Sequence, residues 1–226
     1  MSPSRPAPGA EIVYGRRPVR EAKRGRRQVR QVWTADEKSD SDLTRLAGSP
    51  EHQGIVAEVD PYPYADAGEF LEREDGLIVA LDQVQDPHNL GAVCRSAEAA
   101  GAAGVVIPER RAAHVTAAAC KASAGAIEHI PIARVRNLTD WLGEAKERGG
   151  WIYGGEGAGP VPYTQVDLTG RAVLVFGSEG KGLRPRVADA CDQLISIPMR
   201  GSVGSLNVAA AAAVLLFEAV RQRGRV

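Results

Sequence analysis

The feature that most constrains the fold is a regular alternation of apolar runs and helical segments that begins at residue 76. Runs such as LIVAL, GVVIP and AVLVF are typical of strands buried on both faces, and the segments between them carry apolar residues at helical spacing. Strands and helices that alternate in this way form a mainly parallel sheet covered by helices. The sequence therefore predicts an α/β domain over residues 76–226.

Within this domain the apolar runs predict strands at 76–84, 104–108, 130–135, 151–156, 172–178 and 193–199. Helices are expected at 89–101, 115–127, 137–150, 184–191 and 205–223. The last helix is apolar on almost every face until Glu218, so we expect it to be buried on all sides.

Positive charge is concentrated at the start of the chain. Residues 1–33 hold nine Lys or Arg and two acids, although the whole chain has a formal net charge of zero. Such an asymmetry indicates that one end contacts a polyanion, the alternative being a basic tail that is merely solvated. Residues 1–10, rich in Pro, Ser and Ala, are expected to be disordered.

Other residue types exclude several classes of protein. Three widely spaced cysteines without a C-x-x-C pair argue against a disulfide framework or a zinc site, and the four histidines show no metal-ligand spacing. We therefore expect no metal and a reducing compartment. The sequence has neither an apolar run long enough for a membrane span nor a signal peptide at its start, so a cytoplasmic location is expected.

The stretch VFGSEGKGLRPR at residues 175–186 resembles a phosphate-binding loop but lacks its chemistry. Leu183 and Arg184 stand where a P-loop needs Lys and Ser or Thr, and no glycine completes a dinucleotide fingerprint. Glu179 would repel a phosphate in the middle of the loop. The loop therefore suits a ligand that is neutral or cationic, unless its glycines serve only tight turns.

Two further segments follow predicted strands. IPMRGSVGSLNVAAA at 197–211 is a second glycine loop that leads into a helix, and DPHNLGAVCRSAEAAG at 86–101 opens another helix. Loops at the carboxyl ends of neighbouring strands are the usual ligand site of an open α/β sheet. Asn89 could be only a helix cap and Arg95 only a solvated residue. However, Arg95 lies among small and apolar residues, where a guanidinium needs a partner or a substrate.

In order and spacing, these three segments resemble the signature motifs of the SpoU (TrmH) family of S-adenosylmethionine-dependent RNA ribose methyltransferases, over residues 76–223. The resemblance implies a SPOUT-type parallel sheet with a C-terminal trefoil knot, S-adenosyl-L-methionine as cofactor, and a homodimer. It implies cofactor contacts at Gly177, Ile197 and Leu206. It also implies chemical roles for the following residues: Asn89, Arg95, Glu179, Ser205 and Asn207. Arg95 would act on the ribose 2′-oxygen, as a base or as a cation that stabilises charge.

The front end, IVYGRRPVREA followed by HQGIVAEV, is similar to the small L30e-like RNA-binding domain of one branch of this family. We expect a shortened domain of this kind at 11–62, a linker at 63–75 and the methyltransferase domain at 76–226. That branch implies a guanosine of 23S ribosomal RNA as target. Transfer RNA, or ribosomal RNA modified for antibiotic resistance, is the alternative. The expected RNA contacts are basic residues: Arg16, Arg17, Arg20, Lys23, Arg24, Arg26, Arg27 and Arg30.

Two readings from other classes remain to be weighed. A non-catalytic RNA-binding module that keeps the fold as a scaffold is disfavoured because its motif residues are intact: Asn89, Arg95, Glu179 and Asn207. A nucleotide-binding oxidoreductase is disfavoured because the dinucleotide fingerprint is missing.

Overall fold

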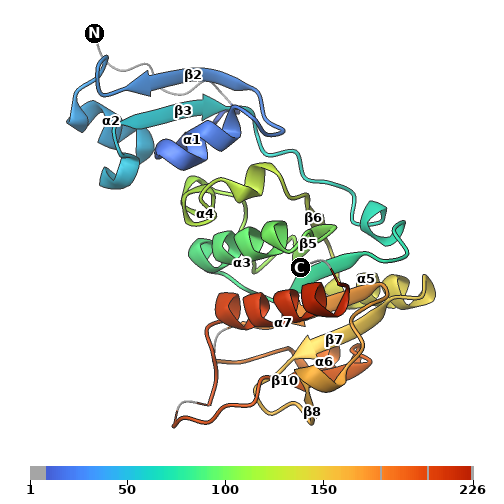
Figure 1. Ribbon diagram of the computed structural model, residues 1–226. Helices are drawn as coiled ribbons and strands as arrows, with labels where there is room; N and C mark the ends of the chain where they lie inside the picture. Colours follow the sequence, from blue (N-terminus) through green and yellow to red (C-terminus); the bar gives the residue numbers. More distant parts are fainter. Residues whose placement is uncertain (1–8, 179, 203, 225–226) are drawn as a thin grey trace.

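The structure is a computed structural model that describes residues 9–178, 180–202 and 204–224. A small antiparallel sheet near the N-terminus lies next to a larger parallel sheet flanked by helices (Figure 1). The α/β class predicted from the alternating pattern is confirmed.

The small sheet has the strand order β1-β3-β2. Both pairings are antiparallel. Gly15, with φ 98°, makes the tight turn between the first strand and the basic helix, a conformation that favours glycine. Ser39 begins the second helix by accepting a hydrogen bond from the Asp42 backbone N–H at 3.2 Å. The elements are β1 (Glu11–Tyr14), α1 (Arg16–Ala22), β2 (Val29–Thr34), α2 (Asp40–Ala47) and β3 (Ile55–Val59).

The large sheet has seven strands in the order β6-β5-β4-β9-β7-β10-β8. All of its pairings are parallel. The strands are β4 (Leu77–Leu81), β5 (Gly104–Pro108), β6 (Ile132–Val135), β7 (Trp151–Gly155), β8 (Val161–Pro162), β9 (Ala172–Phe176) and β10 (Gln193–Ser196). Only β8 was not predicted, because two residues carry no readable period.

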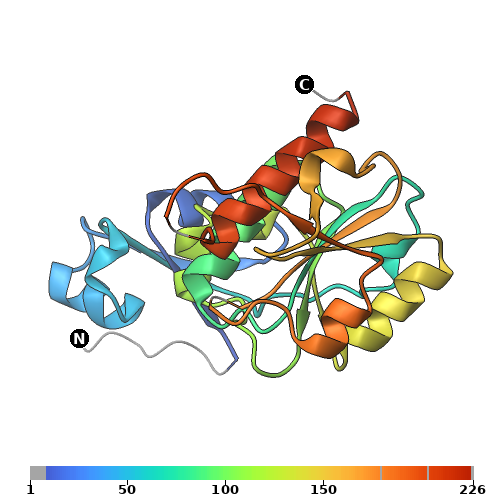
Figure 2. The same ribbon diagram turned by 90° about the horizontal axis from the view of Figure 1, so that it is seen from below.

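Helices cover both faces of the large sheet. Seen along the sheet in Figure 2, α3 (Pro87–Ala99) and α7 (Val208–Gln222) lie on one face, and α5 (Leu138–Glu147) and α6 (Pro185–Asp189) lie on the other. The helix predicted at 115–127 is shorter than expected. Ala124 and Gly125 have positive φ, so α4 (Ala117–Ala122) ends before them and a 3-10 turn, η3 (Ala126–Glu128), follows.

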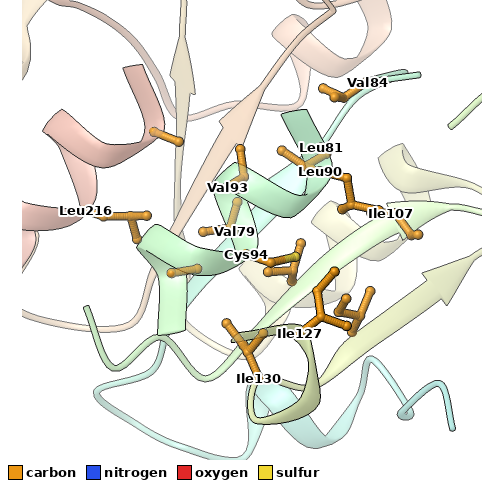
Figure 3. Packing of buried hydrophobic residues seen from close by; sticks show 14 of the residues in the cluster. Val79, Leu81, Val84, Leu90, Val93, Cys94, Ile107, Ile127, Ile130 and Leu216 are labelled. Carbon is orange, nitrogen blue, oxygen red and sulfur yellow. The ribbon is translucent and has the colours of Figure 1, made fainter. Parts of the chain in front are cut away.

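Alternate residues of the strands point into two separate cores. Val79 and Leu81 of β4 belong to the core that α3 and α7 complete, whereas Ile78 and Ala80 belong to the core beneath α5 and α6. Figure 3 shows the first core, in which side chains of β4, α3, β5, η3 and α7 converge around Cys94.

The prediction that the C-terminal helix is buried on all sides is wrong for the single chain. Leu215 and Leu216 of α7 are buried, but the Phe217 side chain is 48% exposed. The apolar face of α7 around Phe217 is therefore left uncovered by the part of the chain that the structure describes. Among the described residues, no helix has the length and apolar character needed to cross a membrane.

The small sheet is joined to the large domain by shared packing. Val19 of α1 and Val59 of β3 belong to the same core as the strands of the large sheet. The segment 63–75, expected as a linker, is also packed against the sheet. The Ala65 N–H donates to the Ile132 carbonyl at 2.9 Å, and Phe70 is buried.

Candidate active site

A pocket of about 260 Å³ lies beyond the C-terminal ends of β7, β9 and β10, where the loops after these strands meet the start of α7. This edge is the usual ligand position in an open α/β sheet. The lining includes the three positions expected to bind a cofactor, together with Ser205. Residues from both glycine loops and from the strand ends line the pocket, among them Gly155, Glu156, Phe176, Gly177, Gly180, Lys181, Gly182, Ile197, Gly204, Ser205 and Leu206.

Packing requires glycine at some positions of the two glycine loops but not at others. Ser178 and Gly182 exchange backbone hydrogen bonds of 3.2 and 3.0 Å, which close the loop. A Cβ added at Gly177 would lie 2.1 Å from the carbonyl carbon of Gly182, so Gly177 is required by the closure itself. By contrast, a Cβ at Gly180 or Gly204 would meet no atom within 4 Å, so packing does not require glycine there.

Asn89 and Asn207 are brought together although they are 118 residues apart, since the Asn207 Nδ2 donates to the Asn89 Oδ1 at 2.9 Å. The Asn207 Oδ1 also accepts the Ala209 N–H at 2.9 Å and so begins α7. Asn89 does not cap its own helix, because Asp86 does so by accepting the His88 N–H at 2.8 Å. Asn89 is 8% exposed, and its amide joins the starts of α3 and α7 beside the pocket.

Arg95 is not placed with the pocket residues. Arg95, expected among small and apolar residues to need a partner or a substrate, has an exposed side chain on α3 that does not line the pocket. Within the described ranges its guanidinium forms no hydrogen bond or ion pair. Glu179 lies outside the described residues.

Two acidic residues that the motif analysis missed are part of this region. Asp82, directly after β4, is fully buried and accepts the Arg184 backbone N–H at 2.9 Å and its Nε at 2.7 Å. Its own N–H donates to the Phe176 carbonyl at 2.7 Å, so it holds the end of the glycine loop against β4 and β9. Glu156 follows β7 and lines the pocket. An acid immediately after an apolar run was the available signal for both.

Seven of the eight basic residues expected to contact RNA are exposed. Some of them already have intramolecular partners. The Arg20 Nε donates to Glu21 at 2.8 Å, and this bond, followed by that from His129, lowers the pKa of the Glu21 carboxyl. The exposed residues are Arg16, Arg17, Arg20, Lys23, Arg24, Arg26 and Arg30.

Arg27 corrects the expectation for the eighth. Its side chain is buried, pairs with both oxygens of Glu128, and donates from Nη1 to Glu11 at 2.8 Å. Burial, the largest single influence, would lower the pKa of Arg27, but the hydrogen bonds and charges of Glu128 and Cys120 together outweigh it, so the pKa is raised. Its charge is therefore used inside the protein and is not free for a phosphate group.

The three cysteines are free thiols. Burial raises the pKa of Cys94 above its usual range and the pKa of Cys120 to about 12. Burial also raises the pKa of Cys191 to about 12. Since the thiolate is the reactive form, burial disfavours a nucleophilic role for these cysteines at neutral pH.

Comparison with known proteins places this geometry among RNA methyltransferases. The SpoU rRNA Methylase family matches residues 76–217. The chain is 45% identical over 181 residues to the putative TrmH family tRNA/rRNA methyltransferase YacO of Bacillus subtilis, covering 78% of this chain and 73% of that protein. It is 38% identical over 95% of its length to an uncharacterized tRNA/rRNA methyltransferase of Synechocystis, of which it spans 63%.

Solved structures give the same result. The SpoU methyltransferase AviRb from Streptomyces viridochromogenes, in complex with the cofactor AdoMet, superimposes with a TM-score of 0.82 at 30% identity, covering 96% of this chain and 91% of that one. An RNA 2′-O ribose methyltransferase shares the fold with a TM-score of 0.80 at 24% identity, over 95% of this chain and 89% of the other.

Proposed function

Since the chain belongs to the SpoU rRNA methylase family, we propose that it transfers a methyl group from S-adenosyl-L-methionine to a ribose 2′-hydroxyl of RNA. The observation that carries the proposal is the pocket built from the loops after β7, β9 and β10, where Gly177, Ile197, Ser205 and Leu206 meet. S-adenosyl-L-methionine is the cofactor, as in the AdoMet complex of AviRb.

The pocket lining fits this cofactor better than it fits a phosphorylated nucleotide. Main-chain groups of the two glycine loops can bind the edge of an adenine, and Phe176 and Ile197 provide apolar surface. Lys181 is the only basic side chain among the described lining residues, and Glu156 contributes a carboxylate. When bound, the cofactor supplies a methyl group on a sulfonium, which is electrophilic without further activation.

The protein then has to orient the ribose and stabilise charge on its 2′-oxygen. The Asn89–Asn207 pair fixes the starts of α3 and α7, and Ser205 lines the adjoining pocket. Arginine stays protonated at neutral pH, so Arg95 stabilises the developing oxyanion. Because Arg95 is exposed and does not line the pocket of its own chain, we propose that it completes the site of a second copy.

A homodimer is consistent with the uncovered apolar face of α7 around Phe217. A trefoil knot is part of the same proposal. It is supported by the close approach of Gly204 to the loop after β7, where a Cβ on Gly157 would lie 3.3 Å from the Gly204 carbonyl oxygen.

The proposed RNA is ribosomal, with a guanosine of 23S ribosomal RNA as the methylated residue, and the enzyme would act in the cytoplasm. The exposed basic residues of α1, in an N-terminal unit that we propose to be a shortened L30e-like domain, support an RNA surface. Transfer RNA is the second candidate, because the relatives are described as tRNA/rRNA methyltransferases.

The test is methyl transfer from S-adenosyl-L-methionine to purified ribosomal and transfer RNA, with the 2′-O-methylated positions mapped by mass spectrometry. Arg95→Ala is expected to lower the rate at least a hundredfold, since removing one preorganised donor to an oxyanion costs about that much. Cofactor affinity should persist, because Arg95 does not line the pocket.

Glu98→Ala, at an exposed position of the same helix, is the control and should leave the rate unchanged. Near-normal turnover of Arg95→Ala would remove Arg95 from the mechanism. Cofactor binding by the unaltered chain without methyl transfer to any RNA would favour the non-catalytic RNA-binding module.

A further inference from the structure

A carboxylate that no sequence motif marks lies against the glycine loop of the pocket. Glu156 directly follows β7, and its backbone N–H donates to the Ile195 carbonyl at 2.9 Å, which fixes it beside β10. Its side chain is half-buried, and its Oε2 accepts the Leu183 N–H at 3.3 Å. The carboxylate is therefore held between β7 and the end of the 177–182 loop.

The backbone of the loop makes room for this carboxylate. Gly182 has φ 67°, and a Cβ added there would lie 2.7 Å from the Glu156 Oε2 and 2.9 Å from its Oε1. Gly182 is thus required both by its left-handed conformation and by the group packed over it.

The charge of Glu156 has no counterion among the residues that the structure describes. No ion pair joins it to Lys181 or to another described base, and its Oε1 has no hydrogen-bond partner in the described chain. A half-buried carboxylate that lines a ligand pocket without a cation attracts a positively charged ligand group and repels a phosphate.

We propose that Glu156 recognises the positive charge of the cofactor and so determines the specificity of the pocket for S-adenosyl-L-methionine. The inference rests on the proposed function and deepens it. The cofactor has two cationic groups, the sulfonium and the α-ammonium, and a carboxylate attracts either of them through its negative charge.

The test is calorimetric titration of the full chain and of Glu156→Gln with three ligands. S-adenosylmethionine carries both cations, S-adenosylhomocysteine carries only the ammonium, and 5′-methylthioadenosine carries neither. Glutamine keeps an oxygen acceptor for the Leu183 N–H but removes the charge. We expect Glu156→Gln to weaken S-adenosylmethionine about tenfold or more, the range of one hydrogen bond to a charged group, and to leave 5′-methylthioadenosine unchanged.

The S-adenosylhomocysteine titration identifies the cation. If Glu156→Gln binds S-adenosylhomocysteine as much more weakly as it binds S-adenosylmethionine, Glu156 contacts the ammonium. If its affinity for S-adenosylhomocysteine is unchanged, Glu156 contacts the sulfonium. Glu147→Gln, which removes an exposed carboxylate of α5, is the control for net charge and should bind all three ligands normally.

Two results would overturn the proposal. One is an unchanged S-adenosylmethionine affinity in Glu156→Gln; the other is an equal loss for all three ligands, which would mean that the side chain only supports the loop. If the unaltered chain itself fails to bind S-adenosylmethionine, the proposed function fails first, so the two failures are distinguishable.

Discussion

Arg27 carries its charge in the interior, between the N-terminal sheet and η3. Its Nε donates to the Glu128 Oε2 at 3.1 Å, its Nη2 lies 3.3 Å from the Cys120 sulfur, and its guanidinium lies 5.7 Å from the centre of the Tyr62 ring. The backbone at Gly25 also lies close to Glu128. A Cβ on Gly25 would lie 2.4 Å from the Glu128 Cβ. Arg27 therefore adds a buried ion pair to the shared packing that joins the N-terminal part to the large domain.

Arg27→Ala is expected to lower the free energy of unfolding by about 3 kcal/mol, because it leaves the Glu128 carboxylate buried without its partner. Arg24→Ala is the control, because the Arg24 side chain is exposed and its Nη1 pairs only weakly with the Glu21 Oε1, at 3.9 Å. This change should alter the free energy of unfolding by less than about 0.5 kcal/mol. Urea denaturation measures both. Equal effects of the two changes would show that the buried pair is not a structural tie.

Glu218 gives a pH dependence of stability. Its carboxylate accepts the Arg221 Nε at 2.8 Å and the Gln222 Nε2 at 2.8 Å, and the bond from Arg221 lowers its pKa to about 2. A depressed pKa in the folded state stabilises the protein above the unfolded pKa, which is near 4.5, and this contribution is lost as the pH falls toward 2.

We therefore expect Glu218→Gln to cost stability at pH 7 and to reduce the loss of stability between pH 5 and pH 2, the window in which the carboxyl titrates. Urea unfolding midpoints between pH 2 and pH 7 measure this pH dependence, with Glu98→Gln at an exposed position of α3 as the control. The same pH slope in Glu218→Gln and the unaltered chain would contradict the assignment.

Among the elements, α3 and α4 pack so closely that a helix-interior glycine is needed at their contact. A Cβ on Gly91 would lie 2.5 Å from the Ala119 carbonyl oxygen and 2.7 Å from the Ala122 Cβ. By contrast, Gly143 in α5 has no atom within 4 Å of a built Cβ. Glycine is therefore required for packing at position 91 of α3, whereas packing does not require it at position 143 of α5.

The two glycines should respond to alanine with opposite signs. Gly91→Ala is expected to destabilise by about 1–3 kcal/mol through overpacking, despite the better helix propensity of alanine. Gly143→Ala should stabilise by up to about 1 kcal/mol, since only the propensity changes. Thermal unfolding measures both, and stabilisation by Gly91→Ala would show that the helices separate without cost.

For the whole molecule, the asymmetry of charge survives folding. Arg16, Arg17 and Arg20 remain exposed on α1, whose apolar side packs into the common core. Deleting the N-terminal part would therefore uncover core residues, and charge reversal is the cleaner test of its role.

Reversing these three arginines to glutamate is expected to weaken RNA binding and to make the plot of log affinity against log salt shallower by about one unit for each lost phosphate contact. Cofactor affinity should not change. Arg45→Glu on α2, also exposed, is the control. Unchanged RNA affinity with an unchanged salt slope would mean that the basic helix is only solvated.

The sequence by itself determined the succession of strands and helices along the large domain, apart from β8, because hydrophobic periodicity and helix caps are local properties. One such cap is Asn137, which accepts the Thr139 N–H at 3.1 Å. It also located the glycine loops that form the pocket. It did not determine which charges are buried. Arg27, in a basic stretch, is buried, whereas Arg95, among small residues, is exposed.

Only the tertiary structure decided which charged side chains are buried. Burial of a charge depends on a partner brought from far along the chain, such as Glu128, 101 residues from Arg27. In the same way, Glu156 lies at the glycine loop because β7 pairs with β9 and β10, and the amide of Asn89 meets Asn207 because α3 packs beside α7. No local period in the sequence carries that information.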